Sequence, residues 1–539
     1  MGIRIWILAL LWSAWAWSDI PQSSQEGRIL FLIQQGEHQQ ALKLYQKIFQ
    51  AKEDHHFELL HRIGIGLLDY GFRQQDPEIQ LLTLFGAMVS AHEDAYYILE
   101  ESLKSRYPQI QLVALGGLSQ IQQDRADKAI VRALGASHLL VRYEAVSQLC
   151  KKKHPQAVDQ AESLMYKSPR AILPLYPPLF ARLGNAKSIR ILRKLMNDPS
   201  ENVRISVILS VAKYERDDFL PQIRQQVMHF NFAQQEASAY ALGTLKDEQS
   251  LTKLNKLTSS QYPTVALAAN WALYHLGQES AAQAIEDAAL REDVFAIAAL
   301  GTLSEHSPVL LKLMEHPHLQ VRMNAILALL EQQDPAALDK IEEVLIRGRL
   351  DLAFLPIKSP GKAFTAWKVV SGASQMLKED IEAYKEHLEL KESLLAKVKT
   401  LSSQAFLKLA AQIFAAQQND LVPALVDLLE EMNTPEALGC LKIHQQKLGA
   451  PLIRNYCNLS LYRLGETGPY GDLLRQWVRN QSQTDLIRFR AFDPWEINQN
   501  THQFTPEESS RLLIESFEAF ANNQDMEGIE LLIDVIADG

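Results

Sequence analysis

The sequence predicts an all-α protein, a right-handed α-α superhelix in which antiparallel helix pairs stack into a solenoid. Two observations lead to this prediction. Between positions 76 and 347 a short sequence motif repeats about every 31 residues, and the segments between its copies have apolar residues at helical spacing. The 539 residues, 47% of them hydrophobic and 22% charged, are more than one compact core usually holds. An extended array explains the length.

The first 18 residues are typical of a secretory signal peptide. A short basic start, Met1 to Arg4, precedes the apolar run Ile5 to Trp17, which is broken only by Ser13, and Ser18 offers a cleavage point before Asp19. The alternative is a retained membrane anchor. Because a run of 13 residues is shorter than the roughly 20 needed to span a bilayer, we expect cleavage and export to the periplasm or beyond, with no stable membrane span afterwards.

Residues 19–75 are expected to form a helical cap before the array. The stretch Leu32 to Tyr45 resembles the middle of one tetratricopeptide unit, with Gly36 at the turn and Ala41 and Tyr45 on the second helix. A solenoid has to cover the apolar face of its terminal unit, and a helical cap would do so.

The array itself, residues 76–347, contains about nine units, each read as helix, turn, helix. Each first helix has an apolar anchor near its start; the anchors are at 79, 110, 141, 172, 203, 233, 265, 294 and 321. The residue four positions later is small in most units; these residues are Ala114, Ala145, Ala237, Ala269, Ala298 and Ala325. Because residues i and i+4 share a helix face, this pair predicts close packing between neighbouring units.

These units resemble HEAT repeats, in particular the short bacterial form also seen in phycobilisome lyase subunits. The dipeptides Val141-Arg142, Val203-Arg204 and Val321-Arg322 match its pattern, whereas Gln80 and Gln111 depart from it. The resemblance implies an armadillo-like helical fold whose concave surface, lined by the second helices, binds partners. It also implies that the arginines bond to acidic groups or carbonyls of adjoining units, a structural role.

Three further segments complete the prediction. Pro356, Pro360 and Gly361 break the helical pattern, so residues 348–364 are expected to be a boundary loop. Residues 365–480 are predicted to be degenerate helical repeats, and residues 481–539 a loop followed by a C-terminal helical cap.

The search for chemistry predicts neither an enzyme nor a cofactor, because no catalytic or nucleotide-binding motif is present. Cys150, Cys440 and Cys457 are too few for a disulfide framework, although a bridge between the last two stays open. His55, His56 and His61 form the densest histidine cluster, but on one helix they diverge, so no metal site is predicted.

One concentration of positive charge is a candidate partner-binding patch for an acidic partner or a phosphate. Its residues are Lys151, Lys152, Lys153, Arg190, Arg193 and Lys194. The alternative for the lysine run is a solvated turn between helices. The formal net charge of −10 argues against nucleic acid as the partner.

The sequence therefore favours an exported, non-enzymatic scaffold or adaptor that binds a protein or peptide partner on a helical solenoid. Two alternatives stay open at this stage. One is a bilin-lyase-like enzyme or chromophore carrier, suggested by the phycobilisome resemblance, and the other is a nucleic-acid-binding protein of the HEAT-like class.

Overall fold

The computed structural model describes residues 25–49, 55–90, 92–303, 307–346, 352–372, 376–377, 380–447, 450–482 and 506–538. The predicted signal peptide and most of the predicted loop after residue 480 lie outside these ranges. The chain divides into two compact units, one made of Met1–Val141 with Asn458–Gly539 and the other of Arg142–Cys457. The divisions fall inside two helices, α9 (Leu139–Lys151) and α28 (Pro451–Arg463).

The first unit contains helices from both ends of the sequence. They are α2 (Gln25–Gln34), α3 (His38–Phe49), α4 (Phe57–Arg73), α5 (Pro77–Ser90), η2 (Glu93–Ala95), α6 (Tyr96–Ser102), α7 (Pro108–Gln120), α8 (Asp124–Ala133), α29 (Tyr470–Ser482), α30 (Pro506–Asn522) and α31 (Met526–Asp538).

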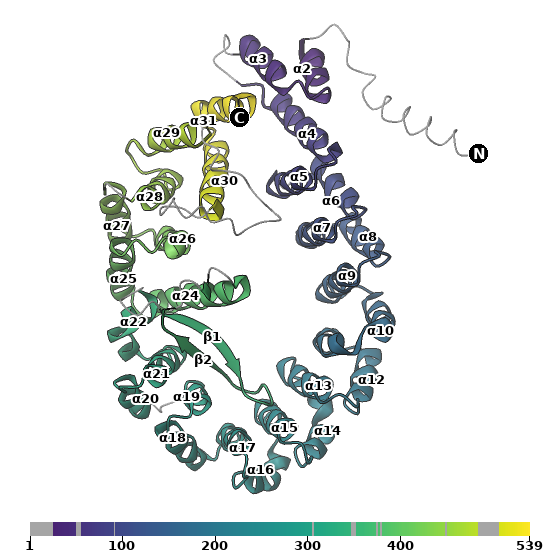
Figure 1. The fold of residues 1–539 in the computed structure, drawn as a ribbon, viewed down its shortest axis with the longest axis vertical. Coiled ribbons are helices and arrows are strands. Elements are labelled where there is room, and N and C mark those ends of the chain that lie inside the picture. Colours follow the sequence, from purple (N-terminus) through teal and green to yellow (C-terminus); the bar gives the residue numbers. More distant parts are fainter. Residues whose placement is uncertain are drawn as a thin grey trace, which may run out of the picture. The chain divides into compact units, whose positions relative to one another are not determined.

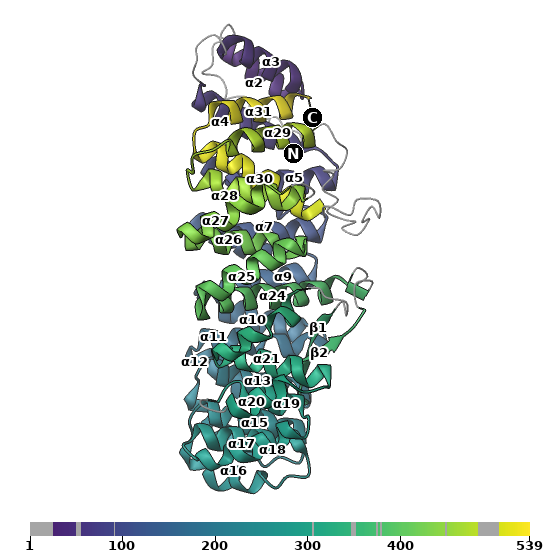
Figure 2. The same ribbon diagram turned by 90° about the vertical axis from the view of Figure 1, so that its left-hand side faces the viewer.

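The second unit contains the remaining helix pairs and one hairpin of strands (Figures 1 and 2). Its elements are α10 (Ala157–Lys167), η3 (Arg170–Leu175), α11 (Pro177–Leu183), α12 (Ala186–Leu195), α13 (Glu201–Lys213), η4 (Asp217–Phe219), α14 (Leu220–Gln226), α15 (Phe232–Thr244), η5 (Glu248–Ser250), α16 (Leu251–Leu257), α17 (Pro263–His275), η6 (Glu279–Ala281), α18 (Ala282–Leu290), α19 (Val294–Leu300), α20 (Ser307–Met314), α21 (Leu319–Glu331), η7 (Pro335–Asp339), α22 (Ile341–Leu345), β1 (Ala353–Lys358), β2 (Thr365–Val370), α24 (Ile381–Leu401), α25 (Ser403–Ala415), η8 (Asn419–Leu421), α26 (Val422–Met432) and α27 (Pro435–Gln445).

The predicted all-α solenoid is confirmed, and most units keep the predicted packing pair. The anchor and the residue four positions later are both buried in six units; these pairs are 110 and 114, 141 and 145, 203 and 207, 233 and 237, 265 and 269, and 321 and 325. Successive first helices pack directly on each other, as α13, α15 and α17 do. Figure 2 shows the helices of the second unit from the side, stacked in layers.

Three of the predicted anchors are wrong. Ile79 is 39% exposed, because α5 turns Leu81 and Leu84 into the core instead. Ile172 lies in η3, a 3-10 helix with Pro174 inside it, so this unit starts without a regular first helix. In α19 the buried register moves by one residue and Ile297 takes the core position.

Two of the arginines that follow the anchors, Arg204 and Arg322, have the structural role that the sequence predicted, whereas Nε of Arg142 is buried with no hydrogen-bond partner among the described residues. Arg204 donates from Nε to the side-chain oxygen of Gln234 in the next unit (2.8 Å) and from Nη1 to the carbonyl of Asp198 (2.6 Å). Arg322 donates in the same way to the carboxylate of Glu343 (3.0 Å) and to the carbonyl of His316 (2.8 Å). These side chains therefore tie turns and helices together.

The two predicted terminal caps share one hydrophobic core in the first unit. Helices α2 and α3 form the expected pair, with Gly36 at φ +82° in the turn between them. Ile29, Ile33 and Tyr45 are fully buried together with residues 529 and 533 of α31. The first and last helices of the described chain thus cover each other's apolar faces.

The predicted boundary loop, residues 348–364, is wrong at residues 353–358, which form β1 and pair with β2 (365–370) as an antiparallel hairpin, whereas residues 359–364 connect the two strands without strand structure. Pro356 lies opposite Trp367, whose N–H points away from β1 to the side-chain oxygen of Asn324 (2.9 Å). At such a position the backbone N–H makes no hydrogen bond to the partner strand, so a proline there removes no hydrogen bond from the sheet. Pro356 is therefore compatible with a strand.

Residues 365–480 were predicted to be helical. The first of them, 365–370, form β2 instead, and the helices begin with α24. The structure records Cys440 and Cys457 as free, so the bridge left open by the sequence is not formed. Among the described residues, no helix has the length and apolar character needed to cross a membrane.

Close packing between α15 and α17 leads to a first prediction. A Cβ added at Gly243 would lie 2.6 Å from the backbone Cα of Ala272, whereas one added at Gly439 in α27 meets nothing within 4 Å. We expect Gly243→Ala to destabilise the protein by about 1 to 3 kcal/mol, despite the better helix propensity of alanine. Gly439→Ala should stabilise it by roughly 0.5 to 1 kcal/mol. Urea-unfolding midpoints measure both, and equal shifts of the same sign would contradict this account of the packing.

Candidate functional site

The six residues of the predicted basic patch fall into two groups, the lysine run at 151–153 and the basic residues of α12. Helices α10 and α12 run alongside each other, with Lys187 paired to Asp159 (2.5 Å) near their starts and Lys194 donating to the hydroxyl of Tyr166 (2.9 Å) near their ends. Lys151, Lys152 and Lys153 precede the start of α10, so roughly 10 to 15 Å of helix separates them from Lys194.

The basic residues of α12 also have local partners. Arg193 pairs with Asp218 at 3.8 Å and lies over the ring of Phe219, and the ammonium of Lys194 lies 5.0 Å from the centre of the Tyr166 ring. Arg190 is exposed on the same helix. A single phosphate could not contact both groups of the predicted patch.

The concave side of the second unit is lined by first helices, not by the second helices that the HEAT resemblance implied. Figure 1 shows the hairpin lying along this side, with the second helices α14, α16, α18 and α20 on the opposite side. Strand β2 packs against α19 and α21. Part of the surface predicted to bind a partner is therefore covered by the chain's own residues 353–370.

A buried carboxylate holds the tip of this hairpin. Glu236 of α15 is fully buried, and its oxygens accept hydrogen bonds from the hydroxyl of Ser359 and from the backbone N–H groups of Gly361 (3.0 Å) and Ala363 (3.3 Å). A Cβ at Gly361 would lie 2.4 Å from the carbonyl of Ala233, so the turn approaches α15 as closely as only glycine permits.

Side chains of two other helices fix the rest of the hairpin. Asn324 of α21 bonds both the N–H and the carbonyl of Trp367, and Gln320 accepts from the N–H of Val369 (3.0 Å). On the other edge, Nδ1 of His387 in α24 accepts from the N–H of Phe354 (3.1 Å). Each strand thus has backbone groups bonded to side chains of the helices, which leaves fewer of them open to another strand.

An aromatic ridge lies on a different surface, at the turns that lead into α15 and α17. We define it as Met228, Phe230, Phe232 and Tyr262. Phe230 is 90% exposed, Met228 47% and Tyr262 38%. The rings of Phe232 and Tyr262 stack with centroids 4.7 Å apart, and Phe230 lies against His229 at 4.2 Å. The ridge therefore joins two successive units with apolar side chains in solvent.

A shallow depression between α25 and α27 contains a cysteine and a histidine, but its chemistry is not that of a nucleophile. Nδ1 of His444 lies 2.9 Å from the carbonyl of Cys440 and 3.8 Å from its sulfur. Burial raises the pKa of the Cys440 thiol to about 11 and lowers the pKa of His444. A thiol with a raised pKa stays protonated near neutral pH and is a poor nucleophile.

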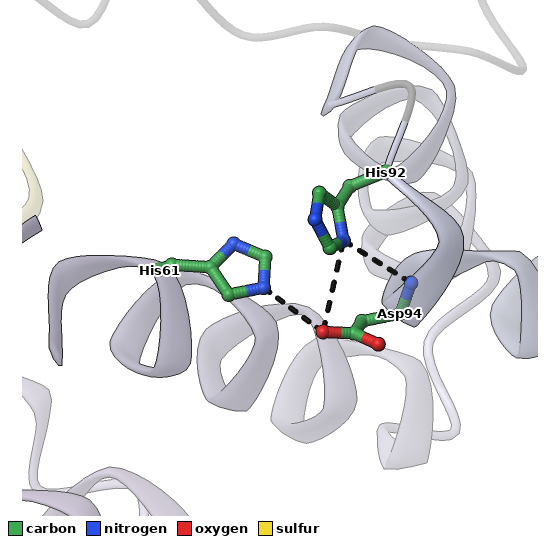
Figure 3. Close-up of side chains that lie close together, drawn as sticks. All are labelled: His61, His92 and Asp94. Atoms are coloured by element: carbon green, nitrogen blue, oxygen red, sulfur yellow. Dashed lines mark hydrogen bonds and ion pairs between the residues drawn. The ribbon is translucent and has the colours of Figure 1, made fainter. Parts of the chain in front are cut away.

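The three clustered histidines separate as predicted, but one of them meets two residues that the sequence analysis missed. His56 is the N-cap of α4, and Nδ1 of His55 lies 3.3 Å from the hydroxyl of Tyr45. His61 faces the other way, and its Nε2 lies 3.0 Å from Oδ2 of Asp94. Nδ1 of His92 lies 3.7 Å from the same oxygen, and all three side chains point toward one another (Figure 3).

The known structures with some likeness to this chain share little of its sequence. No protein-family model and no curated protein matches the chain. Human deoxyhypusine hydroxylase in complex with glycerol is 16% identical, with 46% of this chain and 99% of that one covered and a TM-score of 0.22. The karyopherin Kap121p bound to the extreme C-terminus of the protein phosphatase Cdc14p is 12% identical over 95% of this chain, with a TM-score of 0.38.

Importin beta is 10% identical over 96% of this chain and 77% of its own, with a TM-score of 0.36. The chain spans about two thirds of the Kap121p chain, 66% in the complex with Cdc14p. With identities of 10% to 16% and TM-scores of 0.22 to 0.38, these likenesses assign neither a family nor an activity to this chain.

The hydrogen bonds of Glu236 lead to a second prediction. In Glu236→Gln, the amide NH2 would face backbone donors that now point at a carboxylate, so buried N–H groups would lose their acceptor. We expect the amides of residues 353–370 to exchange with solvent at least about tenfold faster, a loss of roughly 1.4 kcal/mol. Hydrogen exchange followed by mass spectrometry measures this change.

The matched control is Glu248→Gln, because Glu248 is an exposed glutamate in the same unit. Hairpin exchange should be unchanged in that variant. Equal protection of the hairpin in wild-type protein and Glu236→Gln would show that the carboxylate does not hold the tip.

Proposed function

We propose that this protein is an exported, non-enzymatic scaffold or adaptor that binds a protein or peptide partner on its helical solenoid. The observation that carries the proposal is the aromatic ridge. Interfaces between proteins are enriched in exposed aromatic residues and methionine, and such residues provide much of the binding free energy. A stack of similar units can present these side chains at regular spacing along one edge.

The position of the ridge supports an extended partner. Phe230 and Tyr262 occupy the same place in two successive units, three residues before the anchors at 233 and 265. An extended peptide laid across the turns would meet one aromatic side chain from each unit. A partner on the turns is also favoured because the hairpin already covers the concave side at α19 and α21.

The two alternatives from the sequence have less support. A bilin-lyase-like function rests on the resemblance alone, and no described feature adds to it. Nucleic-acid binding would be favoured by a continuous positive surface, but the basic residues of α12 pair with Asp218 and Tyr166 and lie away from the lysine run. Binding of a protein partner by the aromatic ridge is therefore the function proposed.

Export rests on the N-terminal sequence. We expect the chain to leave the cytoplasm and to begin at Asp19 after cleavage. Replacing Leu8 and Leu11 by arginine would interrupt the apolar run between Ile5 and Trp17 and should block export. The N-terminal mass of exported protein and the distribution of protein across cell fractions measure the two expectations. Exported protein that retains Met1, or unaltered export of the variant, would contradict the proposal for the leader.

The proposed surface can be tested with a photo-crosslinking amino acid at position 230 of the full chain. We expect one protein to crosslink there and not from position 256, an exposed place on α16. Phe230→Ser should weaken the binding of that protein by about tenfold or more, as loss of an interfacial aromatic residue does. Lys256→Ser is the control, and circular dichroism confirms that each variant is folded. Equal binding by Phe230→Ser and Lys256→Ser would exclude the ridge.

A further inference from the structure

The group formed by His61, His92 and Asp94 in the first unit goes beyond the scaffold function. We propose that these three side chains bind one divalent transition-metal ion, of which Zn²⁺ is the probe. The three donor atoms, an imidazole nitrogen from each histidine and a carboxylate oxygen, all lie within 4.8 Å of one another. Imidazole nitrogen and carboxylate oxygen are the donors that Zn²⁺ takes from histidine and aspartate.

The spacing of the donors suits a tetrahedral ion. With metal–ligand bonds of about 2.0 to 2.2 Å, two ligands of a tetrahedral Zn²⁺ ion lie roughly 3.3 to 3.5 Å apart. The two distances to Oδ2 of Asp94 are 3.0 Å from Nε2 of His61 and 3.7 Å from Nδ1 of His92, one on each side of that range. Small side-chain rotations would bring all three atoms to bonding distance.

The two elements that carry the ligands are held by packing. Leu59 and Ile63, two residues before and two after His61, are buried and fix α4, so that the half-exposed face of the helix carries the histidine. On the other side Ala95 is fully buried, and the side chain of Gln123 donates to Glu93 at 2.6 Å. The ligands therefore converge from supported backbone and not from a free loop.

Each ligand is also open to solvent, which an ion needs for entry. The side chains of His61, His92 and Asp94 are 37%, 51% and 62% exposed. Three protein ligands leave a fourth position for water or for a side chain of a partner. The arrangement has one competitor, because Nδ1 of His92 now accepts the N–H of Asp94 at 3.2 Å. Since this N–H belongs to an exposed residue, water can replace the histidine as its acceptor.

The same contacts have a metal-free explanation that the experiment must separate. A protonated His61 beside Asp94 is an ordinary surface ion pair, which contributes little to stability. His92 also lies within ion-pair distance of Asp94, at 3.7 Å, so both histidines could pair with this carboxylate without a metal. A metal site requires His92 equally, and it predicts a stoichiometric ligand-bound state that an ion pair does not have.

The test uses the full chain purified without a polyhistidine tag, and Zn²⁺ is titrated in competition with a chromophoric chelator. We expect one Zn²⁺ to bind per chain, and His61→Ala, His92→Ala and Asp94→Asn each to weaken binding on the order of 100-fold. His138→Ala removes an exposed histidine of the same unit and should leave the affinity unchanged. Co²⁺ in place of Zn²⁺ should give the visible absorption of a four-coordinate ion, and this signal should be lost in His92→Ala.

Two results would overturn the proposal. One is that wild-type protein binds Zn²⁺ no more tightly than His92→Ala does. The other is a Zn²⁺ affinity that falls in His138→Ala as much as in His61→Ala. Circular dichroism of each variant separates loss of the site from loss of the fold. Asp94→Asn keeps the size and most of the hydrogen bonding of the residue, so its result stands even if a histidine variant is unstable.

Discussion

The rest of the structure depends on the contact between successive first helices. Each helix pair has an apolar face that only the next pair covers, and the backbones approach closely enough that Gly243 lies against the Cα of Ala272. Alanines at 237 and 269 are fully buried for the same reason. Small residues at these positions set the distance between units. The arginines at 204 and 322 hydrogen-bond to neighbouring helices and turns.

The hairpin lies on the concave side of these first helices. The hairpin bonds to the buried polar residues Glu236 and Asn324 of the first helices, and its Phe364 packs on the rings of Tyr240 and Trp271. A buried carboxylate is tolerable when its hydrogen bonds are made, and the turn at 359–363 supplies them. The solenoid thus binds part of its own chain, and the turns carry the exposed aromatic residues.

The candidate sites differ in how far the sequence could show them. The structural role of Arg204 followed from its place beside an anchor, and the separation of His55 and His56 from His61 followed from helix geometry. The meeting of His61 with His92 and Asp94 did not, because the two segments lie about 30 residues apart and only the packing of α4 against η2 brings them together. The division of the basic patch into two groups was hidden for a similar reason, since the parallel alignment of α10 and α12 decides which residues are neighbours.

The sequence by itself determined the period, the helical class and the positions of most buried anchors, because these follow from contacts between residues i and i+4 and from a phrase repeated along the chain. Only the tertiary structure decided that residues 353–370 form strands, that both ends share one core and that Glu236 is buried. The burial of Glu236 and the shared core rest on contacts between distant segments, such as Ser359 with Glu236 and Gln46 with Asp534. The strands pair locally with each other, but Gln320 and Asn324 of α21, more than 40 residues away from their partners in β2, hold them in place. A local pattern does not encode which distant donor will satisfy a given acceptor.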